Sequence, residues 1–145
     1  DQWDALCADP SLIPNAVEEL LRIESPIMAL RRRATKDTEI GGVPIPGGAT
    51  IVIMPASANH DSGQFTDPDS LDIRRQNARE HLTFGKQWHF CLGAPLARFE
   101  YGLMLQLLTS RTPHMRLLEG QVFRYQPQMQ FRALEQLLVE PSPAV

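Results

Sequence analysis

The chain has 145 residues, 43% of them apolar, which is enough for one domain with a hydrophobic core. A net charge of −3 argues against general nucleic-acid binding, and the basic residues are mostly arginines, which favour fixed, hydrogen-bonded contacts. The two cysteines are far apart and indicate no disulfide framework. Because no apolar run approaches the length of a membrane span and no signal-peptide pattern is present, we expect a soluble, cytoplasmic protein that does not bind membranes.

The first part of the chain predicts two helices. Residues 1–6 have the composition of the middle of a helix, without a capping residue or an initiating Met. Pro14 opens the next helix, and Pro26 ends it. The apolar stripe of this helix consists of Ile13, Ala16, Val17, Leu20 and Leu21. Glu19 and Arg22 are neighbours on the same helix, and taken alone such a pair is usually exposed and contributes a few tenths of a kcal/mol, roughly.

Residues 38–54 predict a β-hairpin. Ile40, Val43 and Ile45 alternate with other residues, Pro46-Gly47-Gly48 forms the turn, and the apolar run 51–54 forms a buried strand. Before the hairpin, the run Arg31–Arg33 is typical of a solvated face. After it, the polar segment 59–77 predicts an ordered meander loop.

The segment FGKQWHFCLGAPLAR, residues 84–98, is the most informative part of the sequence. Gly85 and Gly93 relax the backbone where it turns, and Pro95 suits the first turn of a helix. Apolar residues then recur with helical spacing at Leu92, Leu96, Phe99, Leu103 and Leu107, and this helix ends near Thr112. Cys91 is therefore expected at a helix N-terminus, where backbone N–H groups and the helix dipole stabilise a thiolate that can bind a soft or borderline metal.

Other interpretations of Cys91 stand beside this one. A single cysteine is more often a small buried apolar residue than a ligand. A zinc site with His89 needs further ligands, and the remaining candidates have no paired spacing; they are Cys7, His60, His81 and His114. Beyond Pro113, the segments 122–125 and 129–131 predict short strands.

Segment 84–98 resembles the haem-binding signature of the cytochrome P450 family in its soluble bacterial form, Phe-Gly-x-Gly-x-His-x-Cys-x-Gly followed by Leu-Ala-Arg. The matching residues are Phe84, Gly85, His89, Cys91, Gly93, Leu96, Ala97 and Arg98. Gln87 stands where the family has its second glycine. If that position takes a positive φ, Gln87 costs about 1 kcal/mol or more in strain.

A second motif carries the same resemblance. Glu19 and Arg22 resemble the family's Glu-x-x-Arg motif, a structural element that forms a buried, bidentate ion-pair network with a third, basic residue from the meander. The position that matches this third residue is Ser70, which carries no charge. Arg74 and Arg75 are the candidates to substitute for it.

The resemblance implies a fold and a cofactor. It implies an α+β, mainly α fold, with residues 1–145 as the C-terminal part of a P450 domain: helices flanking a small β-sheet, a cysteine-ligand loop, a long helix after the cysteine and a C-terminal β-hairpin. The N-terminal half and the oxygen-activating helix, with its acid and alcohol pair, lie outside this chain. The cofactor is haem b, with Cys91 as the axial thiolate of its iron. The further cofactor-binding residues are Phe84, Gly85, Gly93 and Ala97, with Arg32 and His89 binding the propionates.

The implied function is haem-thiolate monooxygenation of a small lipophilic substrate with O2, an activity of the full-length protein to which this chain contributes no catalytic residue. Segments 26–30 and 126–131 correspond to substrate-lining parts of the family, although the first could equally be core. Electrons would come from NAD(P)H through a ferredoxin or flavoprotein that docks on the cysteine side, near Lys86 and Arg98. The alternatives are a degenerate, non-catalytic haem-binding or interaction module and a haem-free module with Cys91 buried.

Overall fold

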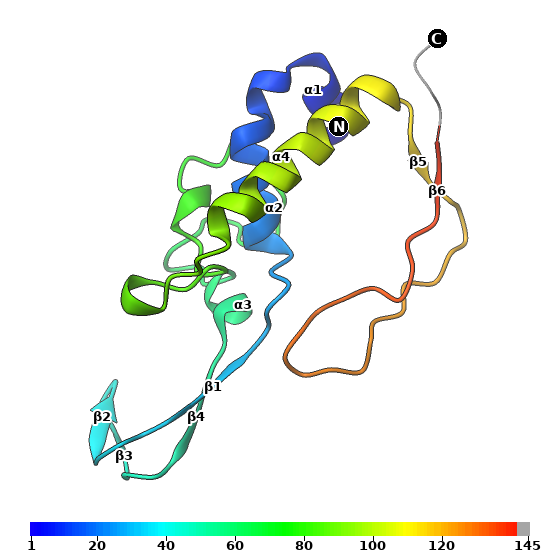
Figure 1. Ribbon diagram of the computed structural model, residues 1–145. Helices are drawn as coiled ribbons and strands as arrows, with labels where there is room; N and C mark the ends of the chain where they lie inside the picture. Colours follow the sequence, from blue (N-terminus) through cyan, green and yellow to red (C-terminus); the bar gives the residue numbers. More distant parts are fainter. Residues whose placement is uncertain (142–145) are drawn as a thin grey trace.

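The computed structural model describes residues 1–141, so residues 142–145 of the predicted domain lie outside the described residues. The α-helices are α1 (Gln2–Ala8), α2 (Ile13–Ile23), α3 (Pro55–Ala58) and α4 (Ala94–Arg111), and short 3-10 helices cover Pro10–Leu12, Ala78–Glu80 and Gln87–His89. Antiparallel pairs form between β1 (Leu30–Arg33) and β4 (Thr50–Ile53), β2 (Thr38–Ile40) and β3 (Val43–Ile45), and β5 (Arg116–Leu117) and β6 (Val139–Glu140). Helices α1, α2 and α4 lie together, while β1 and β4 lead away from them to the β2–β3 hairpin (Figure 1). This mainly helical α+β architecture confirms the predicted fold class.

The first two helices follow local signals, with one correction. The Asp1 carboxylate accepts a hydrogen bond from the backbone N–H of Asp4 over 3.0 Å, and the Asp4 carboxylate accepts one from the Asp1 amino group. This reciprocal capping box satisfies N–H groups that an uncapped helix leaves free, so the prediction of an uncapped first helix was wrong. Helix α2 has Pro14 in its first turn and ends before Pro26, as predicted.

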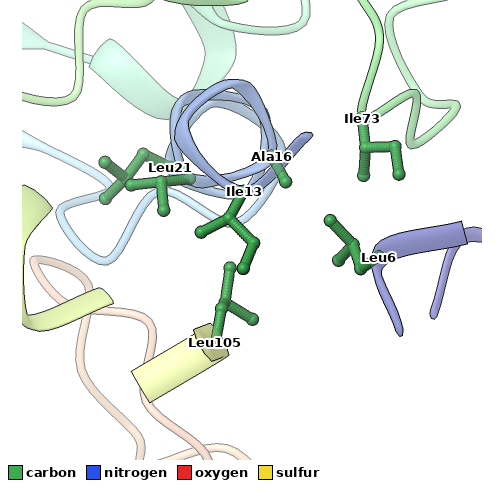
Figure 2. Packing of buried hydrophobic residues seen from close by; sticks show 7 residues of the cluster. Leu6, Ile13, Ala16, Leu21, Ile73 and Leu105 are labelled. Carbon is green, nitrogen blue, oxygen red and sulfur yellow. The ribbon is translucent and has the colours of Figure 1, made fainter. Parts of the chain in front are cut away.

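The hydrophobic core forms where α1, α2 and α4 meet the meander loop. Ile13 of α2 points toward Leu105 of α4, while Leu6 of α1 and Ile73 of the meander pack on another side of the cluster (Figure 2). The cluster comprises Leu6, Ile13, Ala16, Val17, Leu21, Ile73 and Leu105. Each large side chain buried here contributes about 2 kcal/mol. Helix α2 is therefore held at the centre of the molecule, and any charged side chain on its inner faces has to find a partner there.

The meander prediction is confirmed, whereas the hairpin is shorter than predicted and turns earlier. Residues 59–77 contain no helix or strand. Ile40 pairs with Val43, so the hairpin turn is Gly41-Gly42, whose φ angles are +58° and +81°. A two-residue hairpin turn with positive φ at both positions is a type I′ turn, which glycine adopts without strain. The predicted turn at 46–48 instead leads from β3 to β4.

Strand β4 and the C-terminal segment also differ from prediction. The run 51–54 was expected to be a buried strand of the hairpin, but β4 pairs with β1 and most of its side chains are exposed. The expected strands at 122–125 and 129–131 form only single bridges, Tyr125 to Leu134 and Ile27 to Phe131. The predicted C-terminal hairpin exists as the β5–β6 pair, but its strands lie outside the segments chosen for it.

Helix α4 begins with Pro95 in its first turn and ends just before Thr112, as predicted. Its apolar stripe, however, faces outward within this chain. The exposed residues of the stripe are Leu96, Phe99, Leu103 and Leu107, and Leu92, which precedes the helix, is 99% exposed. Across residues 1–141, no helix combines the length and the apolar composition that crossing a bilayer requires.

Candidate functional site

Buried hydrogen bonds fix the start of the cysteine loop next to α2. The side chain of Asn59, which is fully buried, donates a hydrogen bond to the Thr83 hydroxyl over 2.9 Å and accepts one from the backbone N–H of Leu82 over 2.6 Å. The Thr83 hydroxyl in turn donates to the carbonyl oxygen of Leu21 in α2 over 2.6 Å. Because these bonds are buried, they set the position at which the loop begins.

The loop then closes on itself. The backbone N–H of Cys91 donates to the carbonyl oxygen of Phe84 over 2.8 Å. Gly85 has a φ of +70°, and a Cβ added there would lie 2.9 Å from the carbonyl oxygen of His89. Gln87 has a φ of +54°, which is the condition under which the sequence analysis expected strain at this position. The loop thus needs a glycine at position 85, and it carries a strained residue at position 87.

Cys91 is an exposed free thiol rather than a buried apolar residue. Helix α4 starts at Ala94 with Gly93 as its N-cap, and the backbone N–H of Ala94 donates to the carbonyl oxygen of Cys91 over 3.2 Å. Cys91 therefore lies just ahead of the helix, and among the described residues no N–H group donates to its sulfur. Within residues 1–141, no cluster of three or more His, Cys, Asp or Glu side chains could hold a metal ion.

Cys91 opens onto a cavity of about 540 Å³ between the loop, β1 and the start of α3. Its walls are mostly apolar, with contributions from Ile27, Leu30 and Met54. The predicted site residues that line it are Arg32, Phe84, Gly85, His89 and Cys91. Gly93 and Ala97 do not line the cavity: Gly93 lies beside the cysteine, and Ala97 is half-buried in the first turns of α4.

Of the three consecutive arginines on β1, Arg32 lines the cavity, and the geometry of the strand explains why. All three residues of Arg31–Arg33 are exposed and lie on β1, as expected for a solvated face. Side chains alternate between the two sides of a strand, so Leu30 and Arg32 face one side and Arg31 and Arg33 the other. Leu30 and Arg32 line the cavity. The Arg32 guanidinium, the Lys86 ammonium group and the His89 imidazole are thus available at a mostly apolar wall.

The two segments expected to line a substrate pocket lie side by side. The backbone N–H of Met28 donates to the carbonyl oxygen of Gln130 over 2.8 Å, and that of Arg132 donates to the carbonyl oxygen of Pro26 over 2.9 Å. Ile27 lines the cavity, whereas Ala29 is buried. Segment 26–30 is therefore partly cavity wall and partly core.

Glu19 and Arg22 form a buried pair, not an exposed one. Both side chains are fully buried, and the guanidinium donates two hydrogen bonds to the carboxylate, at 2.7 and 2.8 Å. Arg22 also donates to the carbonyl oxygens of Asn59 and Pro68. The pair therefore ties α2 to the meander.

The third basic residue of this network is Arg75. Its Nε lies 3.0 and 3.1 Å from the two carboxylate oxygens of Glu19, while Ser70 contributes only its carbonyl oxygen as an acceptor. Burial alone would raise the pKa of Glu19, but bonds from Arg22, the backbone N–H of Asp72 and Arg75 outweigh it and lower the pKa. The network therefore has its third basic residue in Arg75, although the expected position, Ser70, carries no charge.

Sequence reasoning missed Glu18, a second buried carboxylate on α2. Burial alone would raise its pKa, but hydrogen bonds from His81, Arg98 and Arg79 lower the pKa to about 2. Arg98 was expected on the cysteine-side surface, yet its guanidinium is bound to this carboxylate. The one available signal was a pair of adjacent acids in a helix that otherwise carries a strong apolar stripe.

The comparisons with known proteins agree with this geometry. Residues 8–111 match the sequence model of the family described as Cytochrome P450. The chain is 40% identical over 146 aligned residues to a steroid C26-monooxygenase of Mycobacterium tuberculosis, covering 99% of the chain and 39% of the relative. An intact type IV self-sufficient cytochrome P450 monooxygenase superposes with a TM-score of 0.94 at 50% identity, over 97% of this chain and 18% of that one. The P450 heme domain of Tepidiphilus thermophilus superposes with a TM-score of 0.90 at 51% identity, over 95% of this chain and 33% of that one.

The fold and the cysteine loop together are those of a part of a cytochrome P450 domain. The chain belongs to the cytochrome P450 family, whose matched region covers most of it. It spans less than two fifths of the length of the M. tuberculosis relative.

Proposed function

We propose that this chain forms the cysteine-loop part of a haem-thiolate monooxygenase and that the activity belongs to a longer protein that carries it. The observation behind the proposal is the exposed Cys91 at a mostly apolar cavity of about 540 Å³ that Arg32 and His89 also line. A haem has a flat apolar body, two carboxylates and an iron atom, and these residues fit each part. When bound, haem b supplies the iron chemistry that activates O2 for insertion of one oxygen atom into a substrate C–H bond.

The residues of the loop have separate roles in this proposal. Cys91 binds the iron as a thiolate, and its backbone bond to Phe84 keeps the sulfur in a defined place. Phe84, which lines the cavity, would pack against the cofactor, and Gly85 allows the close turn of the loop. Arg32 and His89 bind the propionates, since a planar guanidinium suits a carboxylate. Gly93 places no side chain beside the Cys91 sulfur, and the backbone N–H of Ala97 donates to the carbonyl oxygen of Gly93 over 2.9 Å.

The substrate we propose is small and lipophilic. The apolar residues Ile27 and Leu30 belong to segment 26–30, which corresponds to a substrate-lining part of the family, and their side chains carry no charge. The steroid C26-monooxygenase of M. tuberculosis, which shares 40% of aligned residues, acts on a steroid by its name, and this supports an apolar substrate class.

Electrons would reach the site from a ferredoxin or flavoprotein that docks on the cysteine side of the loop. Lys86 remains exposed there, whereas the charge of Arg98 is paired with Glu18. We therefore assign the cationic contribution to docking to Lys86 and not to Arg98. The location we propose for the complete protein is cytoplasmic.

The test is the reduced carbon monoxide difference spectrum of the full-length protein reconstituted with haem. We expect a thiolate-type Soret band, red-shifted relative to that of a histidine-ligated haem. Cys91→Ser should abolish this band. Cys7→Ser is the matched control, because Cys7 lies elsewhere, with its thiol near the carbonyl oxygen of Pro113, and should leave the band intact. A thiolate-type band that persists in Cys91→Ser would contradict the assignment.

Gln87 supports a second candidate, a degenerate haem-binding or interaction module without catalysis. Its φ of +54° places an L-residue where backbone strain costs about 1 kcal/mol. In this candidate the full-length protein takes up haem but shows only a histidine-type band, and Gln87→Gly does not restore turnover. A large gain in turnover in Gln87→Gly would argue against it.

A further inference from the structure

Glu18 lies on α2 and contacts His81, where the cysteine loop begins, and Arg98, in α4 beyond the end of the loop. We propose that Glu18 is a positioning residue for Cys91, acting through His81 at the start of the loop and Arg98 beyond its end. The inference deepens the proposed function and rests on it for its spectroscopic test. Glu18 does not contact the cofactor cavity itself, so it acts only through other residues.

The carboxylate is shared between two partners that flank the loop in sequence. Arg98 donates from Nε to one carboxylate oxygen over 2.7 Å and from Nη2 to the other over 3.0 Å. The Nε2 atom of His81 lies 3.1 Å from the second oxygen. Only 3% of the Glu18 side chain is exposed, so these bonds form away from water, where bidentate charge-assisted bonds are strong.

His81 connects the Glu18 carboxylate to the backbone of the loop. Its Nδ1 atom accepts a hydrogen bond from the backbone N–H of Thr83 over 3.2 Å, which assigns the hydrogen to Nε2, the atom that faces Glu18. His81 is therefore bound on both ring nitrogens, and it holds the backbone that directly precedes Phe84.

Phe84 connects both partners to the cysteine. The Arg98 guanidinium lies 4.7 Å from the centroid of the Phe84 ring, and the His81 ring packs on the same residue at 5.7 Å. Phe84 lines the cavity, and its backbone carbonyl oxygen accepts the hydrogen bond from the backbone N–H of Cys91. A shift of either partner would therefore move the residue to which the cysteine backbone is bound.

Neighbouring charges do not duplicate this role. Glu19 is bound to Arg22 and Arg75 and serves the meander. Arg79 also reaches Glu18, at 3.3 Å, but its side chain is 78% exposed and lies outside the loop. Glu18 is thus the charged group of α2 that connects this helix to the loop.

The test uses Glu18→Gln in the full-length protein, which keeps the side-chain volume and removes the charge and one acceptor oxygen. In the haem-free protein, hydrogen exchange of the Cys91 amide should accelerate by about tenfold, while the amide of Leu105 in the core keeps its protection. In the reconstituted protein, the thiolate-type share of the carbon monoxide spectrum should fall several-fold, roughly, in favour of the histidine-type band.

Two variants serve as controls. Glu24→Gln removes a carboxylate at the end of α2 that binds Arg132, and Arg79→Gln removes the exposed partner of Glu18. Both should match the wild type in amide exchange and in the spectrum. If Glu18→Gln does not fold, Arg98→Lys gives the same test, because it keeps the positive charge but loses the bidentate geometry.

Each outcome decides the proposal. Cys91 exchange that is unchanged in folded Glu18→Gln overturns it, and so does exchange that accelerates equally at Cys91 and Leu105, which indicates only a general loss of stability. If the wild-type protein shows no thiolate-type band, the proposed function fails. The exchange measurement then decides the positioning role by itself, since it needs no haem.

Discussion

Gly85 and Gln87 both have positive φ within the cysteine loop, but only one of them suits that backbone. A glycine is required at position 85, because a Cβ would lie 2.9 Å from the carbonyl oxygen of His89. Gln87 occupies its position at a cost of about 1 kcal/mol. The loop keeps its shape because other contacts, such as the bond from Cys91 to Phe84, outweigh this strain.

Replacing Gly85 by alanine should disturb both stability and cofactor uptake. The added methyl group forces either the loop or the His89 carbonyl to move, and alanine is strained at a φ of +70°. We expect the free energy of unfolding to fall by about 2 kcal/mol. Denaturant unfolding of the full-length protein measures this loss, and haem titration measures uptake.

Gly102 provides the matched control for this prediction. It lies inside α4 with nothing within 4 Å of an added Cβ. Gly102→Ala should raise the free energy of unfolding by about 0.5–1 kcal/mol, because alanine favours a helix. Equal losses in both variants would show that the close approach at Gly85 does not matter.

At the scale of elements, the meander is attached to α2 through Arg75. Arg75→Leu would leave the buried Glu19 carboxylate with one arginine in place of two, so we expect a loss of about 3 kcal/mol. Its neighbour Arg74 is exposed, and Arg74→Leu should change stability by less than about 0.5 kcal/mol. Thermal unfolding of the two variants compares them directly. If both lose stability equally, Arg75 is not the third member of the network.

The acid sensitivity of the fold should also originate in α2. The pKa of Glu18 is about 2, below its ordinary value of 4.5, because the bonds from His81, Arg98 and Arg79 outweigh its burial. A depressed pKa stabilises the folded state above pH 4.5, and this stabilisation is lost as the pH falls toward 2. The lowering of the pKa from 4.5 to about 2 corresponds to about 3 kcal/mol in the free energy of unfolding.

The measurement is the free energy of unfolding between about pH 6 and pH 2, compared between wild type and Glu18→Gln. The wild type should lose stability more steeply below pH 4.5 than the variant does. Parallel curves would mean that Glu18 has the same pKa in the folded and unfolded states.

At the scale of the whole molecule, α4 exposes an apolar face that residues 1–141 do not cover. The stripe includes Leu96, Phe99 and Leu103, and the exposed Leu92 lies just ahead of the helix. Contiguous exposed apolar surface promotes association. We therefore expect the isolated 145-residue chain to self-associate and to bind a hydrophobic dye, and the full-length protein to do neither. An isolated chain that remains monomeric and binds no dye would contradict this prediction.

Local signals in the sequence predicted α2, α4 and the cysteine loop well, but they did not predict the short helix α3. Pro14, Pro26 and Pro95 mark where α2 and α4 begin or end, because proline restricts the backbone near it. The hairpin turn was misplaced because two glycine pairs competed, and Gly41-Gly42 has the φ angles that a two-residue turn needs. Strand pairing between β1 and β4 was missed, since it depends on partners distant in the sequence.

The sequence by itself determined the family motifs, the cysteine that leads into a helix and the residue that departs from the pattern at Gln87. Only the tertiary structure decided which charges are buried and with whom they pair. Glu18 meets Arg98 across 80 residues, and Glu19 meets Arg75 across 56. The physical reason is that an ion pair depends on distance and burial, which follow from how α2 packs within the core and not from spacing along the chain.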